Sequence, residues 1–135
     1  MSNPFTAGAI VHAKDIVRLS QFYAAVTGLE IVHEVDDHVV LESETHELVI
    51  VAIPAATAAR IVITVPPQRR ENTAFKLTFA VDDLATARTA ARAAGGDLDA
   101  PEKEWDFQGL RVCDGIDPEG NVIQLRAVPA DAAVD

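Results

Sequence analysis

Lys76 and His12 are the side chains of this 135-residue sequence whose surroundings point most directly to chemistry. Lys76 lies between Phe75 and Leu77, and an ammonium in an apolar stretch is costly without a counter-charge or a ligand. It could anchor an anion, act as a base or Schiff-base amine, reach out to solvent, or pair with a glutamate. His12 also has apolar neighbours, and it could shuttle a proton, bind a ligand, or be a hydrogen-bonded core histidine.

Three further residues are candidates for binding a ligand. Gln124 could hydrogen-bond Lys76 or a ligand amide, or belong to a local network without a ligand. Trp105, the only tryptophan, either anchors a flat ligand or packs a loop on the core. Arg111 could clamp a carboxylate or be an exposed charge. We therefore predict ligand binding by His12, Lys76, Gln124, Trp105 and Arg111, and we assign no catalytic residue.

Composition excludes several classes of protein. Hydrophobic residues make up 49% of the chain, which rules out a disordered acidic protein despite the net charge of −10. That charge argues against nucleic-acid and anionic-membrane partners, since phosphates call for a basic patch. Cys113 is the only cysteine, so no internal disulfide can form, and residues 1–5 lack the features of a secretory signal. We expect a cytoplasmic protein.

Two expected helices echo each other along the chain. Asp15 and Gly28 bound the first, and Asp83 and Gly96 bound the second, 68 positions later. Asp is a preferred helix N-cap and Gly a common left-handed stop. An apolar stretch precedes each Asp and an extended segment follows each Gly. A repeat that occurs only twice indicates two similar units sharing one core, with a pocket at their seam.

The elements that must position the candidate residues follow from this echo. We predict one α+β domain over residues 1–128, in which two βαβββ modules with pseudo-twofold symmetry form a cupped mixed sheet. The modules span about 8–53 and 75–126, with a joint at 54–74 and a frayed tail at 129–135.

In the first module we expect a strand at 8–14, a helix at 16–27, and strands at 29–35, 39–43 and 47–53. In the joint, 55–59 look featureless and 60–65 could form a short strand. In the second module we expect a strand at 75–81, a helix at 84–95, an irregular stretch at 97–108, and strands at 110–114 and 121–127.

Three segments of the chain resemble a known superfamily. They are Phe22-Tyr23 with Gly28-Leu29, Val81-Asp82-Asp83-Leu84, and Asp117-Pro118-Glu119-Gly120-Asn121 leading into Val122-Ile123-Gln124-Leu125. Together with the two-module order, they make residues 8–127 similar to the vicinal oxygen chelate superfamily, which includes glyoxalase I, extradiol dioxygenases, fosfomycin-resistance enzymes and bleomycin-resistance proteins. The resemblance is specific for the fold and weak for function, because this fold hosts unrelated chemistries. It also implies a homodimer, since the cup is often completed across two chains.

The resemblance further implies where metal-using relatives hold their ion. Their ligands include a His seven residues before the Asp that opens each helix, and a carboxylate three residues after the Asn of the Asp-Pro-x-Gly-Asn turn. Here those positions are Gly8, Lys76 and Gln124, and a fourth falls near Ile50 or Val51. Glycine offers no donor atom, a protonated lysine has no lone pair, and a neutral amide is a poorer ligand than a carboxylate. We therefore predict no metal and no cofactor.

Two functions remain open at the level of sequence. The first is a metal-independent small-molecule binding protein, with a ligand held in the cup by His12, Lys76 and Gln124. The acidic composition suits a cationic ligand, whereas Lys76 suits an anionic or carbonyl-bearing one. The second is an enzyme of lyase, isomerase or dioxygenase type, using Lys76 and His12 in acid–base chemistry or a divalent metal at a site with altered ligands.

Overall fold

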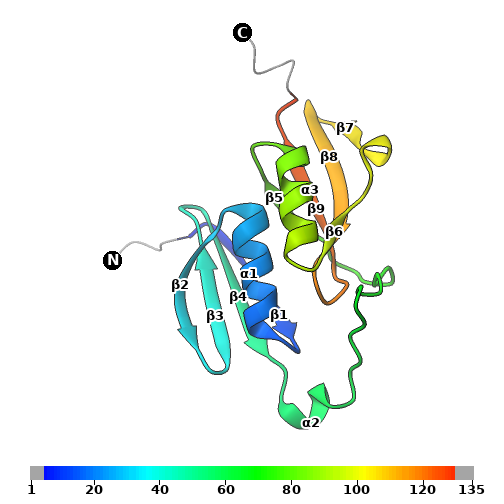
Figure 1. Cartoon of the computed structure of the whole chain (residues 1–135). Coiled ribbons are helices and arrows are strands. Elements are labelled where there is room, and N and C mark those ends of the chain that lie inside the picture. The colour runs from blue at the N-terminus through cyan, green and yellow to red at the C-terminus, as the bar shows by residue number, and fades with distance from the viewer. Residues whose placement is uncertain (1–4, 130–135) are drawn as a thin grey trace.

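The computed structural model describes residues 5–129 as two βαβββ modules (Figure 1). The first contains β1 (Ala7–Ala13), α1 (Ile16–Thr27), β2 (Glu30–Val35), β3 (His38–Glu42) and β4 (His46–Ala52). The second contains β5 (Leu77–Ala80), α3 (Leu84–Ala93), β6 (Asp97–Leu98), β8 (Leu110–Ile116) and β9 (Val122–Ala127). The α+β class predicted from the sequence is confirmed. None of the helices within residues 5–129 is long and apolar enough to cross a membrane.

The two sheets have the same topology. The strand order is β1-β4-β3-β2 in the first sheet and β5-β9-β8-β6 in the second. In each sheet the first strand pairs in parallel with the last, and the other neighbours run antiparallel. This matching order confirms that the repeated Asp and Gly positions mark two similar modules.

Both helices begin where the sequence places them. The Asp15 side chain accepts a hydrogen bond from the Arg18 backbone N–H at 3.0 Å, and Asp83 accepts one from Thr86 at 2.9 Å. Gly28 ends α1 in the left-handed conformation, with φ at 78°. The end of α3 differs from the prediction: the helix stops at Ala93, and the positive φ falls on Gly95, at 96°, rather than on Gly96.

The structure corrects three other expectations. In the joint, the stretch expected to be featureless contains a short helix, α2 (Ala55–Ala58), and residues 60–65 form no strand. The stretch at 97–108 is not irregular, because it contains β6, the 3-10 turn η1 (Pro101–Lys103) and β7 (Trp105–Phe107). β7 pairs with β8 as a hairpin, since Gln108 and Gly109 supply the two positive φ angles of 49° and 79° that such a turn needs. The expected tail lies outside the described residues beyond Pro129.

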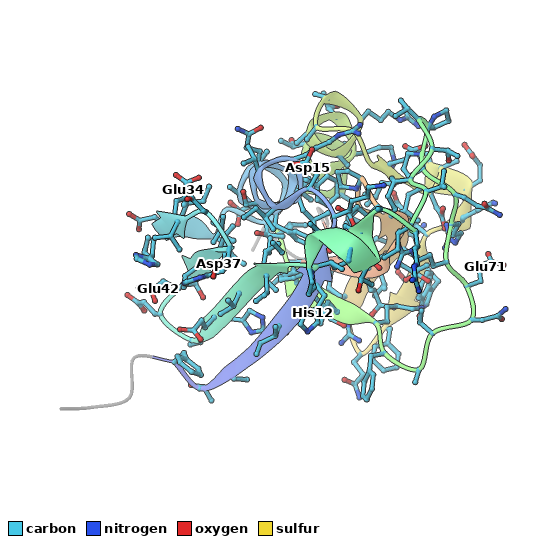
Figure 2. All side chains as sticks on the ribbon, turned by 90° about the horizontal axis from the view of Figure 1, so that it is seen from below. His12, Asp15, Glu34, Asp37, Glu42 and Glu71 are labelled. Carbon is cyan, nitrogen blue, oxygen red and sulfur yellow. The ribbon has the colours of Figure 1, made fainter. Side chains whose placement is uncertain are left out.

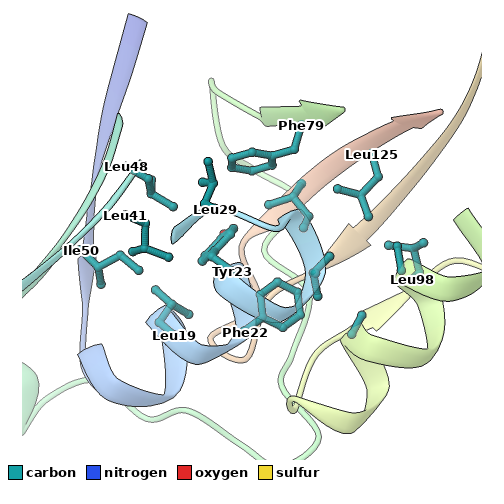
Figure 3. Close-up of a cluster of buried hydrophobic side chains, with 14 of the residues drawn as sticks. Leu19, Phe22, Tyr23, Leu29, Leu41, Leu48, Ile50, Phe79, Leu98 and Leu125 are labelled. Carbon is teal, nitrogen blue, oxygen red and sulfur yellow. The ribbon is translucent and has the colours of Figure 1, made fainter. Parts of the chain in front are cut away.

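A single apolar core joins the modules. Figure 3 shows Leu41, Leu48 and Ile50 of the first sheet and Phe79 and Leu125 of the second around the side chains of α1. Tyr23 is fully buried there, with its ring 5.2 Å from that of Phe22 and 5.6 Å from that of Phe79. Both sheets thus turn one face toward the same core, and burial of each large side chain contributes about 1.5–3 kcal/mol.

The turn between β8 and β9 ties the second module to the first. The Tyr23 hydroxyl donates to the buried Asp117 carboxylate at 2.7 Å. The Glu119 carboxylate accepts from the backbone N–H groups of Lys14 and Asp15, at 2.9 and 2.8 Å. Burial raises the pKa of Asp117, against the opposing effect of its hydrogen bonds from Asn121 and Tyr23. Burial, and then the nearby Asp117, raise the pKa of Tyr23 well above its usual range, so the phenol keeps its proton and donates.

The same turn also fixes the joint. The Arg70 backbone N–H donates to the Gly120 carbonyl at 2.9 Å. Gly120 has a φ of 85°, and a Cβ there would lie 2.0 Å from the carbonyl oxygen of Gln68. Only glycine fits this close approach, so residues 117–121 hold both the first module and the chain that connects the two modules.

Replacing Tyr23 with Phe tests this tie. The Tyr23→Phe variant keeps the ring in the core and removes one hydrogen bond to a charged group, so we expect a loss of about 1.5–3 kcal/mol in the free energy of unfolding. Urea unfolding followed by circular dichroism measures it. The control is Gln21→Ala on the exposed side of the same helix, which should change stability by no more than about 0.5 kcal/mol. An unchanged Tyr23→Phe protein would show that the bond does not hold the modules together.

Candidate functional site

Each sheet has one face that points away from the shared core, here called its open face. The open face of the first sheet carries Gly8, Ile10 and His12 from β1, Glu47, Val49 and Val51 from β4, and His38, Val40 and Glu42 from β3. The open face of the second sheet carries Lys76, just before β5, with Thr78 and Ala80, then Val122, Gln124 and Arg126 from β9, and Val112 and Asp114 from β8. These two faces are where the predicted ligand-binding residues have to be sought.

Polar side chains form a connected row on the open face of the second sheet. The Lys76 ammonium lies 2.8 Å from one carboxylate oxygen of Asp114. The Gln124 amide nitrogen donates to the other oxygen at 3.1 Å, and its amide oxygen accepts from Arg126 Nε at 2.8 Å. Gln124 is 9% exposed, so the row fixes the orientation of a nearly buried amide. The structure therefore brings Lys76 and Gln124 together through Asp114.

A cavity opens beside this row. It has a volume of about 280 Å³ and is lined by Lys76, Asp114 and Val122 together with joint residues between Arg69 and Phe75. The joint thus closes one end of the open face. The other end is bounded by the β7 hairpin, whose Trp105 and Phe107 rings remain 38% and 43% exposed.

Sequence reasoning missed Asp114, Phe107 and Arg126. The Arg126 guanidinium carbon lies 5.0 Å from the centre of the Phe107 ring. Trp105 pairs with Val112, which pairs in turn with Arg126, so these three residues share the open face. The alternation of Arg126 with Gln124 along the strand was a usable signal. Asp114 could be found only from the register of β8 against β9.

Arg111 does not join this group. Its guanidinium contacts Glu104 at 3.3 Å and Asp106 at 3.1 Å, and neighbouring residues of a strand point to opposite faces. Glu104 also pairs with Arg88, at 2.5 Å. The Arg111 side chain therefore belongs to an ion-pair network on the helix side of β8.

His12 lies on the other sheet from the polar row. It is exposed on β1, in register with Val51. Figure 2 shows it on β1 near the centre of the view, whereas Glu34 and Glu42 project from β2 and β3 at the left. Gly8 shares its strand, and a Cβ at this position would lie against Glu47 and Phe5. Within one chain, His12 and Gly8 thus lie on the first sheet, whereas Lys76 and Gln124 lie on the second.

The donor set does not fit the metal that metal-using relatives hold. Gly8 lacks a donor atom, and the positions of the second module hold an ammonium and an amide that are already paired through Asp114. Over residues 5–129, no group of three or more His, Cys, Asp or Glu side chains is placed to hold a metal ion. No step of chemistry can therefore be assigned to a metal at these positions.

A larger cavity, of about 490 Å³, lies at the start of α1. Its polar lining includes Lys14, Asp15 and Glu119. The Glu119 carboxylate is engaged by the two backbone N–H groups that join the modules, and the Lys14 ammonium donates to the Ile61 carbonyl. This cavity is accordingly part of the junction between the modules, and we place the candidate site on the open face of the second sheet.

Two βαβββ modules with this strand order, presenting open sheet faces with polar side chains, define the glyoxalase/bleomycin-resistance/dioxygenase class of folds. The profile of the Glyoxalase-like domain family matches residues 8–126, and the chain belongs to this family. The resemblance to the vicinal oxygen chelate superfamily is thereby confirmed. A comparison with curated proteins found no match.

Solved structures with the same fold cover nearly the whole chain. A glyoxalase/bleomycin resistance protein/dioxygenase family enzyme from Burkholderia phytofirmans is 22% identical, with a TM-score of 0.66 over 90% of this chain and 97% of that one. A fosfomycin resistance protein from Mesorhizobium loti is 12% identical, with a TM-score of 0.60 over 100% and 99%. An antibiotic-binding protein from a Streptomyces species is 19% identical, with a TM-score of 0.60 over 96% and 99%. At these identities the likeness establishes the fold alone.

The polar row makes a prediction about stability. Asp114 is 15% exposed and accepts from two donors, whereas Lys76 is 42% exposed. Asp114→Ala leaves the Gln124 amide buried without its acceptor, so we expect a loss of about 1–3 kcal/mol. Lys76→Met removes a half-exposed charge and should cost less than about 1 kcal/mol.

Urea unfolding of the two variants measures both values. The matched control is Asp106→Ala, which also removes a carboxylate from a cation, here Arg111, but at a position 77% exposed, and it should behave like Lys76→Met. Equal losses for Asp114→Ala and Lys76→Met would contradict the central place of Asp114 in the row.

Proposed function

We propose that this protein is a metal-independent small-molecule binding protein, whose ligand lies in a cup lined by the open face of the second sheet. The observation that carries this proposal is the row Lys76, Asp114, Gln124 and Arg126. Where metal-using relatives hold an ion, this chain places hydrogen-bonding groups in fixed orientations. Such groups bind and orient a ligand without a metal. The antibiotic-binding relative makes a similar role reasonable for this fold.

The same contacts weigh against acid–base catalysis by Lys76 and His12. The Lys76 side chain is held by the Asp114 carboxylate at 2.8 Å, so it is already engaged in an ion pair and is not placed to take a proton from a ligand. His12 lies on the other sheet. An enzyme of lyase, isomerase or dioxygenase type would therefore need to bring the two side chains together from different chains.

We further propose that a second copy of the chain completes the cup, so that the working form is a homodimer. The outer edge of β1 pairs with no strand among the described residues, and Ile10 on this strand is 66% exposed. An unpaired apolar edge strand is a site of association unless something covers it. Within one chain the two open faces point away from the shared core, so each is open to a partner.

Charge supports a second copy as that partner. Across β1, β4, β3 and the paired part of β2, the open face of the first sheet holds Glu30, Glu42 and Glu47 but no lysine or arginine. Across β5, β9, β8 and the residue before β5, the open face of the second sheet holds Lys76 and Arg126 against the single carboxylate of Asp114. Faces of opposite charge on different modules can meet when two chains pair around a twofold axis, because the first module of each chain can then face the second module of the other.

We also propose a cytoplasmic location, which the single cysteine supports.

Binding can be tested with protein purified without added metal. We expect a screen of small organic acids, amides and amines to yield compounds that raise the melting temperature, both before and after treatment with a chelator. Gln124→Ala should reduce the shift, whereas Thr89→Ala on the exposed side of α3 should not. A stoichiometric, chelator-resistant metal in elemental analysis, or shifts that vanish with the chelator, would refute a metal-independent role.

The dimer can be tested through the exposed edge strand. Ile10→Lys places a cation on the open face that would meet the cationic face of the second sheet, so we expect sedimentation velocity to show a monomer at concentrations where the wild type is a dimer. Val17, which is 53% exposed on α1, provides the control, because Val17→Lys lies away from the open faces and should leave the dimer intact. A monomeric wild type would disprove the shared cup.

A further inference from the structure

We infer that Arg126 is the residue that selects the ligand, and that the ligand is a flat organic anion whose carboxylate binds this guanidinium. The inference rests on the proposed function and names the chemical class of ligand for the same face. It follows from the hydrogen bonds of the polar row, from the aromatic rings beside it and from the local charge.

The donors of the row differ in how much of their capacity is already used. Gln124 uses one of its two amide N–H groups on Asp114, and its amide oxygen accepts from Arg126. Lys76 uses one of its three N–H groups on Asp114, 2.8 Å away, and this carboxylate balances its charge. Arg126 spends only Nε, since within residues 5–129 its two terminal nitrogens donate no hydrogen bond and form no ion pair. The guanidinium therefore presents two parallel donors, the arrangement that binds a carboxylate in bidentate fashion.

The guanidinium is also held in place before any ligand binds. Gln124 fixes its Nε at 2.8 Å, and the Phe107 ring lies 5.0 Å from its central carbon. Val112 lies on the open face, where it pairs with Trp105 on one side and with Arg126 on the other. It is nevertheless fully buried, so neighbouring side chains cover it. An arginine held in this way loses little side-chain freedom when it binds an anion.

The rings of Trp105 and Phe107 define the rest of the ligand. Both rings lie on the open face of the second sheet, as Arg126 does. Both residues remain more than a third exposed, at 38% and 43%. Exposed aromatic faces beside a cation favour a flat apolar body attached to the acidic group. The charge of the face agrees, because it carries two cations and one carboxylate in a chain of net charge −10.

A pair of probes that differ only in charge tests the inference. Benzoate is a flat anion and benzamide is its neutral counterpart, and Trp105 is the only tryptophan of the chain, so its fluorescence reports binding at this face directly. We expect the wild-type protein to bind benzoate at least tenfold more tightly than benzamide. Cyclohexanecarboxylate, an anion without a flat ring, should bind more weakly than benzoate.

Two arginine variants locate the effect. Arg126→Gln should abolish the preference for benzoate over benzamide, and Arg126→Lys should retain part of it, because the charge remains while the bidentate fork is lost. Arg92→Gln is the control, since Arg92 pairs with Asp97 at the edge of the second sheet and is exposed. Circular dichroism checks that each variant is folded, and the comparison of benzoate with benzamide on the wild type needs no variant.

Three results would show that Arg126 does not select the ligand. Equal affinity of the wild type for benzoate and benzamide, no response to either probe at millimolar concentration, or a preference that survives in Arg126→Gln overturns the inference. Dissociation of the dimer by Arg126→Gln without any benzoate binding would assign the guanidinium to a carboxylate of the second copy instead. Melting-temperature shifts with other compounds would still support the proposed binding function, so the two proposals fail separately.

Discussion

The hydrogen bonds of the turn between β8 and β9 are the contacts on which the arrangement of this protein depends. Asp117 is fully buried and accepts from Tyr23, and Glu119 accepts from the two backbone N–H groups that precede α1. A buried carboxylate is stable only when donors surround it, so neither residue can move without leaving a charge unsatisfied. Since the partners lie in the first module and the acceptors in the second, these bonds fix how the two modules sit against each other.

That placement determines which surfaces are left for function. α1 packs on the first sheet and against α3, and both sheets turn one face toward the shared core. The opposite faces then remain open in the single chain, where their polar residues can bind one another, a ligand or water. On the second sheet, Asp114 accepts from Lys76 and Gln124, and within residues 5–129 the terminal nitrogens of Arg126 have no partner. The candidate site is thus a consequence of the way in which the core is built.

Much of the fold could be predicted from local signals, and the site only in part. Asp15 and Asp83 start their helices because a side-chain oxygen at that position satisfies a free backbone N–H, which is a local rule. The β7 hairpin was missed because Trp105-Asp106-Phe107 is short and its pairing with β8 is a tertiary contact. Lys76 and Gln124 are brought together as expected, but by Asp114, whose place follows from strand register. Arg111 precedes Val112 on β8, and neighbouring residues of a strand point to opposite faces. Its side chain therefore lies on the helix side of the strand, next to Glu104.

The Asp-Pro-Glu-Gly-Asn turn shows why the family resemblance indicates fold more strongly than function. Asp117 and Glu119 use their carboxylate oxygens to join the modules. Position 120 has to be glycine, because a Cβ there would lie 2.0 Å from the carbonyl oxygen of Gln68 in the joint. None of these three residues belongs to the open faces. Residues that do reach them, such as Lys76, Gln124 and Arg126, make no contact that the modules need in order to pack. They can therefore change without loss of the fold, which allows one scaffold to hold a metal in some relatives and an ammonium, an amide and a guanidinium here.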